Sequence, residues 1–188
     1  AEPLELRARA QEMTGDLGSL KDTLQKLIEI APTSPRGRVA LARLHLQQGE
    51  FADARKQADA LREDDRFVAE GYDLLGDVLY AEGSMTEAAQ AFEKSHELKP
   101  TSQSLLKLNA IKRGLGGESS EMLDEWLSTN PDDAGVRIVK ATSDLADGKT
   151  ETAVANYEKV LESSPENIVA LNNLAWLYDE KDDPRAVE

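Results

Sequence analysis

The chain has 188 residues, 40% of them hydrophobic and 31% charged, which is enough apolar material for a folded core and too much for a disordered chain. Its formal net charge of −14 argues against binding to nucleic acid or to an anionic membrane surface, because both need a basic protein surface. The chain has no cysteine, which excludes disulfides and thiolate chemistry. No apolar run approaches the roughly 20 residues of a membrane-spanning helix.

A spacing of 34 residues recurs along the chain. Gly15, Gly49 and Gly83 are each separated by it, and the longer interval from Gly83 to Gly148 predicts one repeat that is three residues short. The predicted repeats are 1–34, 35–68, 69–102, 103–133, 134–167 and an incomplete 168–188. We expect one domain over 1–188 that is a piece of a longer array.

Each repeat predicts two helices joined by a turn that contains glycine. Apolar residues recur at helical spacing, and no segment shows the period of two that strands require. We expect the hydroxyl of Ser34 to cap the helix that starts at Pro35. Residues 131–133 place acidic side chains where the next helix begins, and a last helix is expected to start at 185–188. The prediction is an all-α chain.

The fourth repeat departs from this pattern. It loses three residues around 113–117 and carries Trp126 on its second helix. One hypothesis is that a shortened first helix leaves a gap that the indole of Trp126 fills. The alternative is that Trp126 only replaces missing core volume.

The third repeat has the side chains of a known repeat family. Tyr72, the pair 75–76, Gly83, Phe92 and Pro100 fit its pattern, and the chain therefore resembles tetratricopeptide-repeat (TPR) proteins. The resemblance implies a right-handed α-solenoid of antiparallel helix pairs, with five repeats and a truncated sixth. Small residues are expected where the two helices of each pair approach closely, at Ala8, Ala42, Gly76, Ala110, Ala141 and Ala175.

Two short segments carry a narrower resemblance. Residues 125–133 and 172–188 resemble parts of large TPR lipoproteins of bacterial exosortase (PEP-CTERM) sorting systems. This resemblance implies a protein of the bacterial periplasm or envelope, in a protein-sorting or exopolysaccharide system. A cytoplasmic TPR adaptor is the alternative.

The TPR resemblance also predicts a binding surface. In this family the first helices line the concave face, and their positions include Glu5, Arg9 and Glu12 in the first repeat. The predicted partner-binding residues are Arg36, Arg43, Gln47, Asp73, Asp77, Tyr80, Asn172 and Trp176. Charges of both signs beside Tyr80 favour a protein or peptide partner. Alternatively, the two arginines pair with Asp73 and Asp77 of the neighbouring helix.

The end of the chain predicts a further contact. Leu171, Leu174 and Tyr178 are expected to form a partly bare apolar face, through which the chain would associate with a second copy.

No motif predicts catalysis, a cofactor or a metal. His45 and His96 lack metal-ligand spacing, and the glycines of 114–117 fit a turn rather than a phosphate-binding loop. The carboxylate clamp of TPR co-chaperones is absent, because Ala40 and Leu74 stand at two of its positions. We therefore expect a non-enzymatic binding scaffold. A structural spacer with no groove ligand is the alternative from a different class.

Overall fold

The computed structural model describes residues 2–32, 34–117 and 120–180, which form helices and turns and contain no strand. None of the described helices has the length and apolar character needed to cross a membrane. The chain divides into two compact units, 1–100 and 101–188, and each is described by itself. The first unit contains α1 (Glu2–Thr14), α2 (Leu17–Ile30), α3 (Pro35–Gln47), α4 (Phe51–Arg62), α5 (Val68–Ala81) and α6 (Met85–Leu98); the second contains α7 (Ser102–Gly114), α8 (Ser120–Thr129), α9 (Ala134–Ala146), α10 (Thr150–Ser163) and α11 (Ile168–Asp179).

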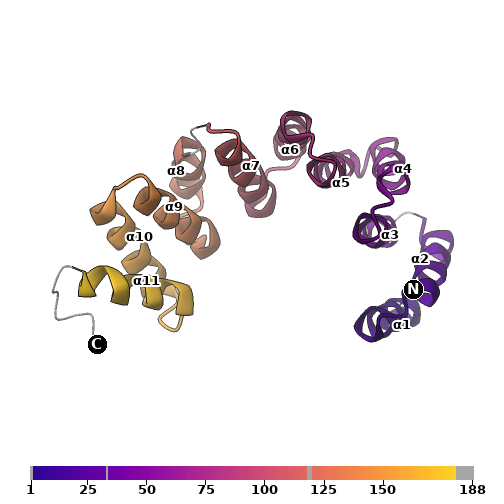
Figure 1. Cartoon of the computed structure of the whole chain (residues 1–188), viewed down its shortest axis with the longest axis horizontal. Coiled ribbons are helices and arrows are strands. Elements are labelled where there is room, and N and C mark those ends of the chain that lie inside the picture. The colour runs from indigo at the N-terminus through magenta and orange to yellow at the C-terminus, as the bar shows by residue number, and fades with distance from the viewer. Residues whose placement is uncertain (1, 33, 118–119, 181–188) are drawn as a thin grey trace. The chain divides into compact units, whose positions relative to one another are not determined.

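Within each unit, every helix packs against the next one in the chain. In the first unit the contacts run in order from α1 to α6, and in the second from α7 to α11 (Figure 1). A stack in which each pair contacts only its neighbours is the arrangement of a solenoid. The predicted all-α architecture of stacked helix pairs is confirmed.

Five glycines mark the turn between the two helices of each repeat. Gly15, Gly49, Gly83, Gly116 and Gly148 all have positive φ, between 73° and 82°. Side chains other than hydrogen are disfavoured in this left-handed region, so glycine ends the first helix here. These glycines therefore give the register of the repeats directly.

This register corrects the prediction for the fourth repeat. Gly116 follows Gly83 after 33 residues and Gly148 follows Gly116 after 32, so the three residues are lost at two places and not only around 113–117. The first helix of this repeat, α7, has 13 residues, the same length as α3. The hypothesis of a shortened first helix is wrong. The short helix is α8, with ten described residues.

Small residues bring the two helices of a pair together, as predicted, at four of the six positions. A Cβ atom on Gly76 would lie 2.5 Å from the ring of Phe92 on α6. Ala8, Ala42 and Ala141 are buried at the equivalent positions. Gly76 itself is buried on α5.

The prediction is wrong for Ala110, which is exposed, and for Ala175 it stays a prediction. The one-residue shift puts Asn109 in place of Ala110 at the helix contact, and Asn109 is buried. At Ala175, the second helix expected at 185–188 lies outside the described residues.

Side-chain caps start several of the helices. Asp16, Thr101, Asp133 and Asn167 each accept a hydrogen bond from a backbone N–H in the first turn of the following helix. This confirms the acidic start predicted after Pro131. Ser34 occupies the capping position before Pro35 but its side chain makes no capping bond, which corrects the prediction for that residue.

Trp126 joins the fourth repeat to the fifth. Its indole Nε1 donates a hydrogen bond to Oδ2 of Asp133 at 2.9 Å, while Oδ1 of Asp133 accepts from the backbone N–H of Val136 at 3.0 Å. The half-buried ring packs against a buried cluster that includes Leu123 and Leu127. Trp126 thus holds Asp133, the residue that caps α9. Its role therefore goes beyond filling core volume.

A buried ion pair lies in the second unit. Nζ of Lys140 donates to both carboxylate oxygens of Asp144, at 2.6 and 2.7 Å, and both side chains are almost fully buried. Asp124 of α8 lies 3.4 Å from the same ammonium, and the amide of Asn156 on α10 donates to Asp144 at 3.2 Å. The pair therefore connects three successive helices, α8 to α10.

The first prediction concerns Asn109. Its side chain is 3% exposed and its Oδ1 has no hydrogen-bond partner, and an unsatisfied buried polar group costs about 1–3 kcal/mol. We expect Asn109→Ala to leave the free energy of unfolding unchanged or to raise it, as measured by urea denaturation. Ala141→Asn, at the equivalent position in the fifth repeat, is the control and should lower it by about 2 kcal/mol. A loss of stability in Asn109→Ala would contradict this account.

The second prediction concerns Trp126. Removal of the ring in Trp126→Ala should lower the free energy of unfolding by about 3 kcal/mol, because both packing and the bond to Asp133 are lost. Trp126→Phe keeps most of the packing and should lose only about 1 kcal/mol, the contribution of the hydrogen bond. Thermal denaturation followed by circular dichroism measures both. Equal losses in the two variants would show that packing contributes nothing.

The third prediction concerns the buried pair. Asp144→Ala leaves the Lys140 ammonium without its main partner and should destabilise the fold by about 3–5 kcal/mol. The double variant Lys140→Met with Asp144→Leu removes both charges and should recover most of that loss. If the double variant is as unstable as the single one, the charge is not the cause.

Candidate partner-binding groove

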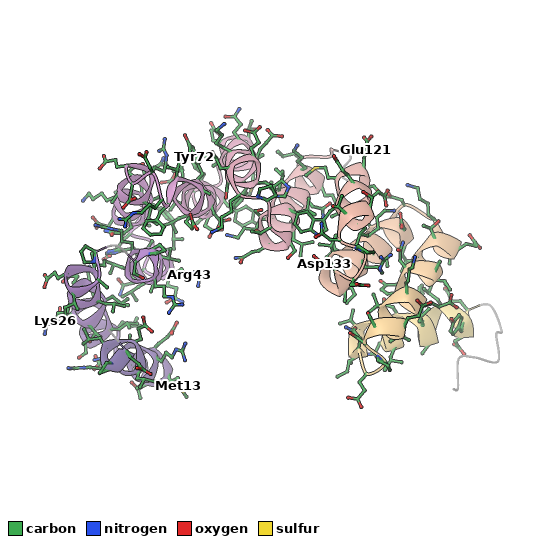
Figure 2. All side chains as sticks on the ribbon, turned by 180° about the vertical axis from the view of Figure 1, so that it is seen from behind. Met13, Lys26, Arg43, Tyr72, Glu121 and Asp133 are labelled. Atoms are coloured by element: carbon green, nitrogen blue, oxygen red, sulfur yellow. The ribbon has the colours of Figure 1, made fainter. Side chains whose placement is uncertain are left out.

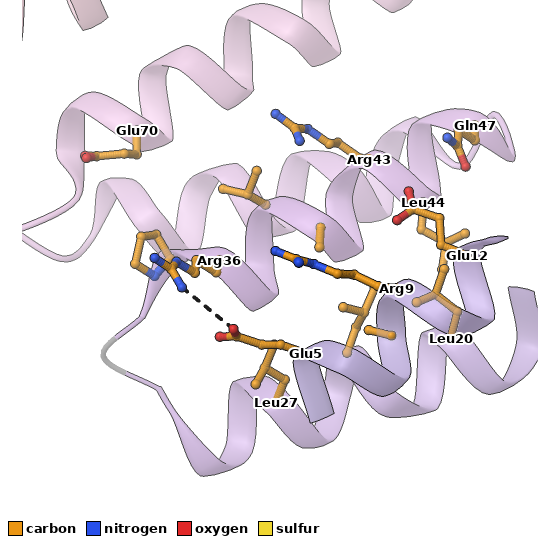
Figure 3. A pocket seen from close by; sticks show the side chains of 15 residues that line it. Glu5, Arg9, Glu12, Leu20, Leu27, Arg36, Arg43, Leu44, Gln47 and Glu70 are labelled. Carbon is orange, nitrogen blue, oxygen red and sulfur yellow. Dashed lines mark ion pairs between the residues drawn. The ribbon is translucent and has the colours of Figure 1, made fainter. Parts of the chain in front are cut away.

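A groove of about 510 Å³ lies in the first unit between α1 and α3 (Figure 3). We call it the α1–α3 groove. Its floor is apolar and its rim is polar. The floor consists of Ala8, Leu20, Leu24, Leu27, Val39, Ala40 and Leu44, and the rim carries Glu5, Arg9, Glu12, Arg36, Arg43, Gln47 and Glu70.

The helix packing explains why a groove forms here. Within the first unit α3 packs against both α4 and α5, whereas α1 packs chiefly on α2. The helix α2 lies beneath both and turns its buried leucines toward the space between them. Leu20, Leu24 and Leu27 have the spacing of one helical face, so α2 supplies the floor.

The charged residues of the rim differ in their partners. The guanidinium group of Arg36 lies 3.7 Å from the carboxylate of Glu5. The carboxylate of Glu70 forms an ion pair with Nζ of Lys99 at 2.7 Å. Neither Arg9 nor Arg43 forms an ion pair or hydrogen bond with any residue that the structure describes. Figure 3 shows both guanidinium groups extending over the groove. The groove thus combines an apolar floor with two cations that have no internal partner.

The family follows from comparison with known proteins. Two family models described as tetratricopeptide repeat match residues 39–102 and 156–186. The chain is built of tetratricopeptide repeats. The resemblance of the third repeat is confirmed, since that repeat lies within the first match.

Two relatives contain similar repeats. The chain is 29% identical over 134 residues to small glutamine-rich tetratricopeptide repeat-containing protein 2 of Mycosarcoma maydis, covering 71% of this chain and 36% of that protein. It is 23% identical over 171 residues to protein O-mannosyl-transferase TMTC1 of Homo sapiens, covering 87% of this chain and 19% of the relative. The chain thus spans about a third and a fifth of the lengths of these relatives.

Solved structures share the fold. A structure of Pseudomonas aeruginosa pilF superposes with a TM-score of 0.70 at 19% identity, covering 98% of this chain and 86% of that one. The TPR protein TTC0263 of Thermus thermophilus gives 0.67 at 20% identity, with 94% and 97% covered. YrrB, described as a TPR protein with an unusual peptide-binding site, gives 0.55 at 20% identity, with 87% and 86% covered. At these identities the likeness shows the TPR fold alone.

Three of the predicted binding residues lie together. Arg36, Arg43 and Gln47 all project from α3 into the α1–α3 groove. Figure 2 shows Arg43 on the opposite side of the first unit from Lys26 of α2. The groove also includes the leucines of α2, which the TPR pattern does not predict, because that pattern places binding residues on first helices only.

The predicted residues of α5 lie outside this groove. Asp73 and Asp77 are half-buried, and Tyr80 is 56% exposed near the end of the helix. The expected pairing of the two arginines of α3 with these aspartates does not occur among the described residues. Arg36 pairs with Glu5 instead, and Arg43 has no partner among them.

The remaining predicted residues belong to the second unit. Asn172 and Trp176 are exposed on α11, and the side chain of Trp176 is 51% exposed. The apolar face expected to be partly bare is covered at two of its three residues, because Leu174 and Tyr178 are buried in a cluster with α10 and the Tyr178 hydroxyl donates to Glu158 at 2.6 Å. Of that face only Leu171 is exposed. Association through this end stays a prediction.

Three potential metal ligands gather at the start of α4. Nδ1 of buried His45 lies 2.5 Å from Oε2 of Glu50, and Asp53 is close to both. The hydrogen bond from His45 holds the pKa of the Glu50 carboxyl below its ordinary value, with a smaller contribution from Lys21 at 3.4 Å. Nζ of Lys56 forms an ion pair with the carboxylate of Asp53 at 2.7 Å. Since each carboxylate already has a partner, the cluster is accounted for as a connection between α3 and α4.

Proposed function

We propose that this chain is a non-enzymatic scaffold that binds a protein or peptide partner on the first-helix face of its repeats. The observation that carries the proposal is the α1–α3 groove, with its apolar floor and the partnerless guanidinium groups of Arg9 and Arg43. Apolar contact supplies affinity and a few placed polar groups fix orientation, which is the usual division in a binding site.

The shape of the groove favours binding over catalysis. It opens between two helices, and its rim mixes three arginines with three glutamates. Acid–base catalysis requires paired titratable groups in a site that excludes water. A segment of polypeptide fits an open groove of this kind, because the chain on either side of the bound residues can extend beyond the ends of the groove.

We further propose that the scaffold works in a bacterial envelope protein-sorting or exopolysaccharide system. This part rests only on the sequence resemblance of residues 125–133 and 172–188 to exosortase-associated TPR lipoproteins. The alternatives are a cytoplasmic adaptor and a structural spacer.

The fourth prediction separates a binder from a spacer. The purified chain should retain a subset of a random peptide library, and Arg43→Glu should abolish retention because it reverses a charge on the groove rim. Lys26→Glu makes the same change on the opposite side of the first unit and should retain the same peptides. Tyr80→Ala tests whether the binding surface continues along α5. A wild-type chain that retains no peptide would favour the spacer.

A further inference from the structure

We propose that the α1–α3 groove recognises an acidic peptide segment, in which a carboxylate lies beside a bulky apolar side chain. The carboxylate binds between Arg9 and Arg43, and the apolar side chain contacts half-buried Val39 and Ala40 of α3. This inference rests on the proposed function and specifies the chemistry of its ligand.

The two arginines are available to a ligand because nothing within the described chain engages them. Arg9 and Arg43 are exposed and have no ion pair or hydrogen bond with described residues, whereas Arg36 on the same rim is paired with Glu5. A ligand carboxylate therefore displaces no internal partner. Guanidinium groups bind carboxylates through two parallel hydrogen bonds, which gives direction as well as attraction.

The repeat places these arginines on neighbouring first helices. Arg9 and Arg43 are 34 residues apart, so they occupy the same position in the first and second repeats. Asp77 holds that position in the third repeat and Ala110, after the shift in register, in the fourth. Among these four repeats the cationic pair occurs only on α1 and α3, the two helices that border the groove.

Charge along the chain favours an acidic ligand at this end. Residues 1–47 contain seven basic and six acidic side chains, a net charge of +1, while the whole chain carries −14. The remaining residues therefore carry −15 in total, although residues 101–117 are locally basic, with Lys107, Lys112 and Arg113 and no acidic side chain. Local charge governs approach within a Debye length of about 8–10 Å, so the acidic residues elsewhere in the chain do not prevent an acidic segment from reaching α1–α3.

The floor and the rim restrict the ligand further. The leucines of α2 are almost fully buried, so the accessible part of the floor is half-buried Val39 and Ala40 of α3. Burial of an apolar ligand side chain there contributes about 25 cal/mol per Å². Glu5 and Glu12 on the same rim repel a second negative charge. A single carboxylate next to an apolar side chain fits this pattern, whereas a polyanion such as nucleic acid does not.

The test uses fluorescein-labelled ten-residue peptides and fluorescence anisotropy with the full chain. One peptide set contains Leu-Asp or Phe-Glu pairs, and a matched set replaces each acid by its amide, as Leu-Asn or Phe-Gln. We expect the acidic set to bind at least about tenfold more tightly. Arg9→Gln and Arg43→Gln should each remove most of this preference, whereas Lys26→Gln, on the opposite side of the first unit, should keep it. Circular dichroism confirms that each variant is folded.

A charge-reversed variant gives a positive readout. Arg9→Glu with Arg43→Glu should prefer peptides with Leu-Lys pairs over those with Leu-Asp pairs. The inference is overturned if wild-type chain binds acidic and amide peptides equally, or if the arginine variants keep the acidic preference. Equal binding would leave the proposed scaffold function intact. If neither these peptides nor a random library binds to the wild-type chain, the scaffold function fails as well.

Discussion

The close approach of the two helices within each repeat is the contact on which the stack depends. A single helix pair cannot bury both of its apolar faces, so each pair must also pack against the next. Gly76 lies against the ring of Phe92, and Ala141 packs in the same cluster as Tyr157. A larger side chain at such a position would separate the helices and disturb the face offered to the next pair.

The fourth repeat shows how the stack accommodates a departure from this rule. A lost residue before Gly116 moves Asn109 into the small-residue position, and α8 is the shortest of the described helices. Polar contacts then replace part of the missing apolar contact. Trp126 holds the cap of α9, and Lys140 connects Asp124 of α8 to buried Asp144. Such bonds require defined geometry and so fix the register of the next pair.

The α1–α3 groove is a consequence of the same packing. The helix α2 packs against both first helices, and its leucines are almost fully buried, so the accessible apolar surface of the groove is half-buried Val39 and Ala40 of α3. The side chains above this floor are long, flexible arginines and glutamates rather than further apolar residues. A small apolar surface with charged edges is suited to a polypeptide segment, because the backbone and polar side chains of the segment remain in water while one side chain is buried.

The sequence by itself determined the TPR architecture, because the 34-residue period, the turn glycines and the helical spacing of apolar residues are local features. It also placed Arg36 and Arg43 on one helix face. Tertiary structure decided the register of the fourth repeat, since only backbone conformation shows that Gly116 is the turn glycine. It also decided which charges are paired and that α2 forms the groove floor. Those features depend on distances between helices, and the periodicity of a sequence does not encode such distances.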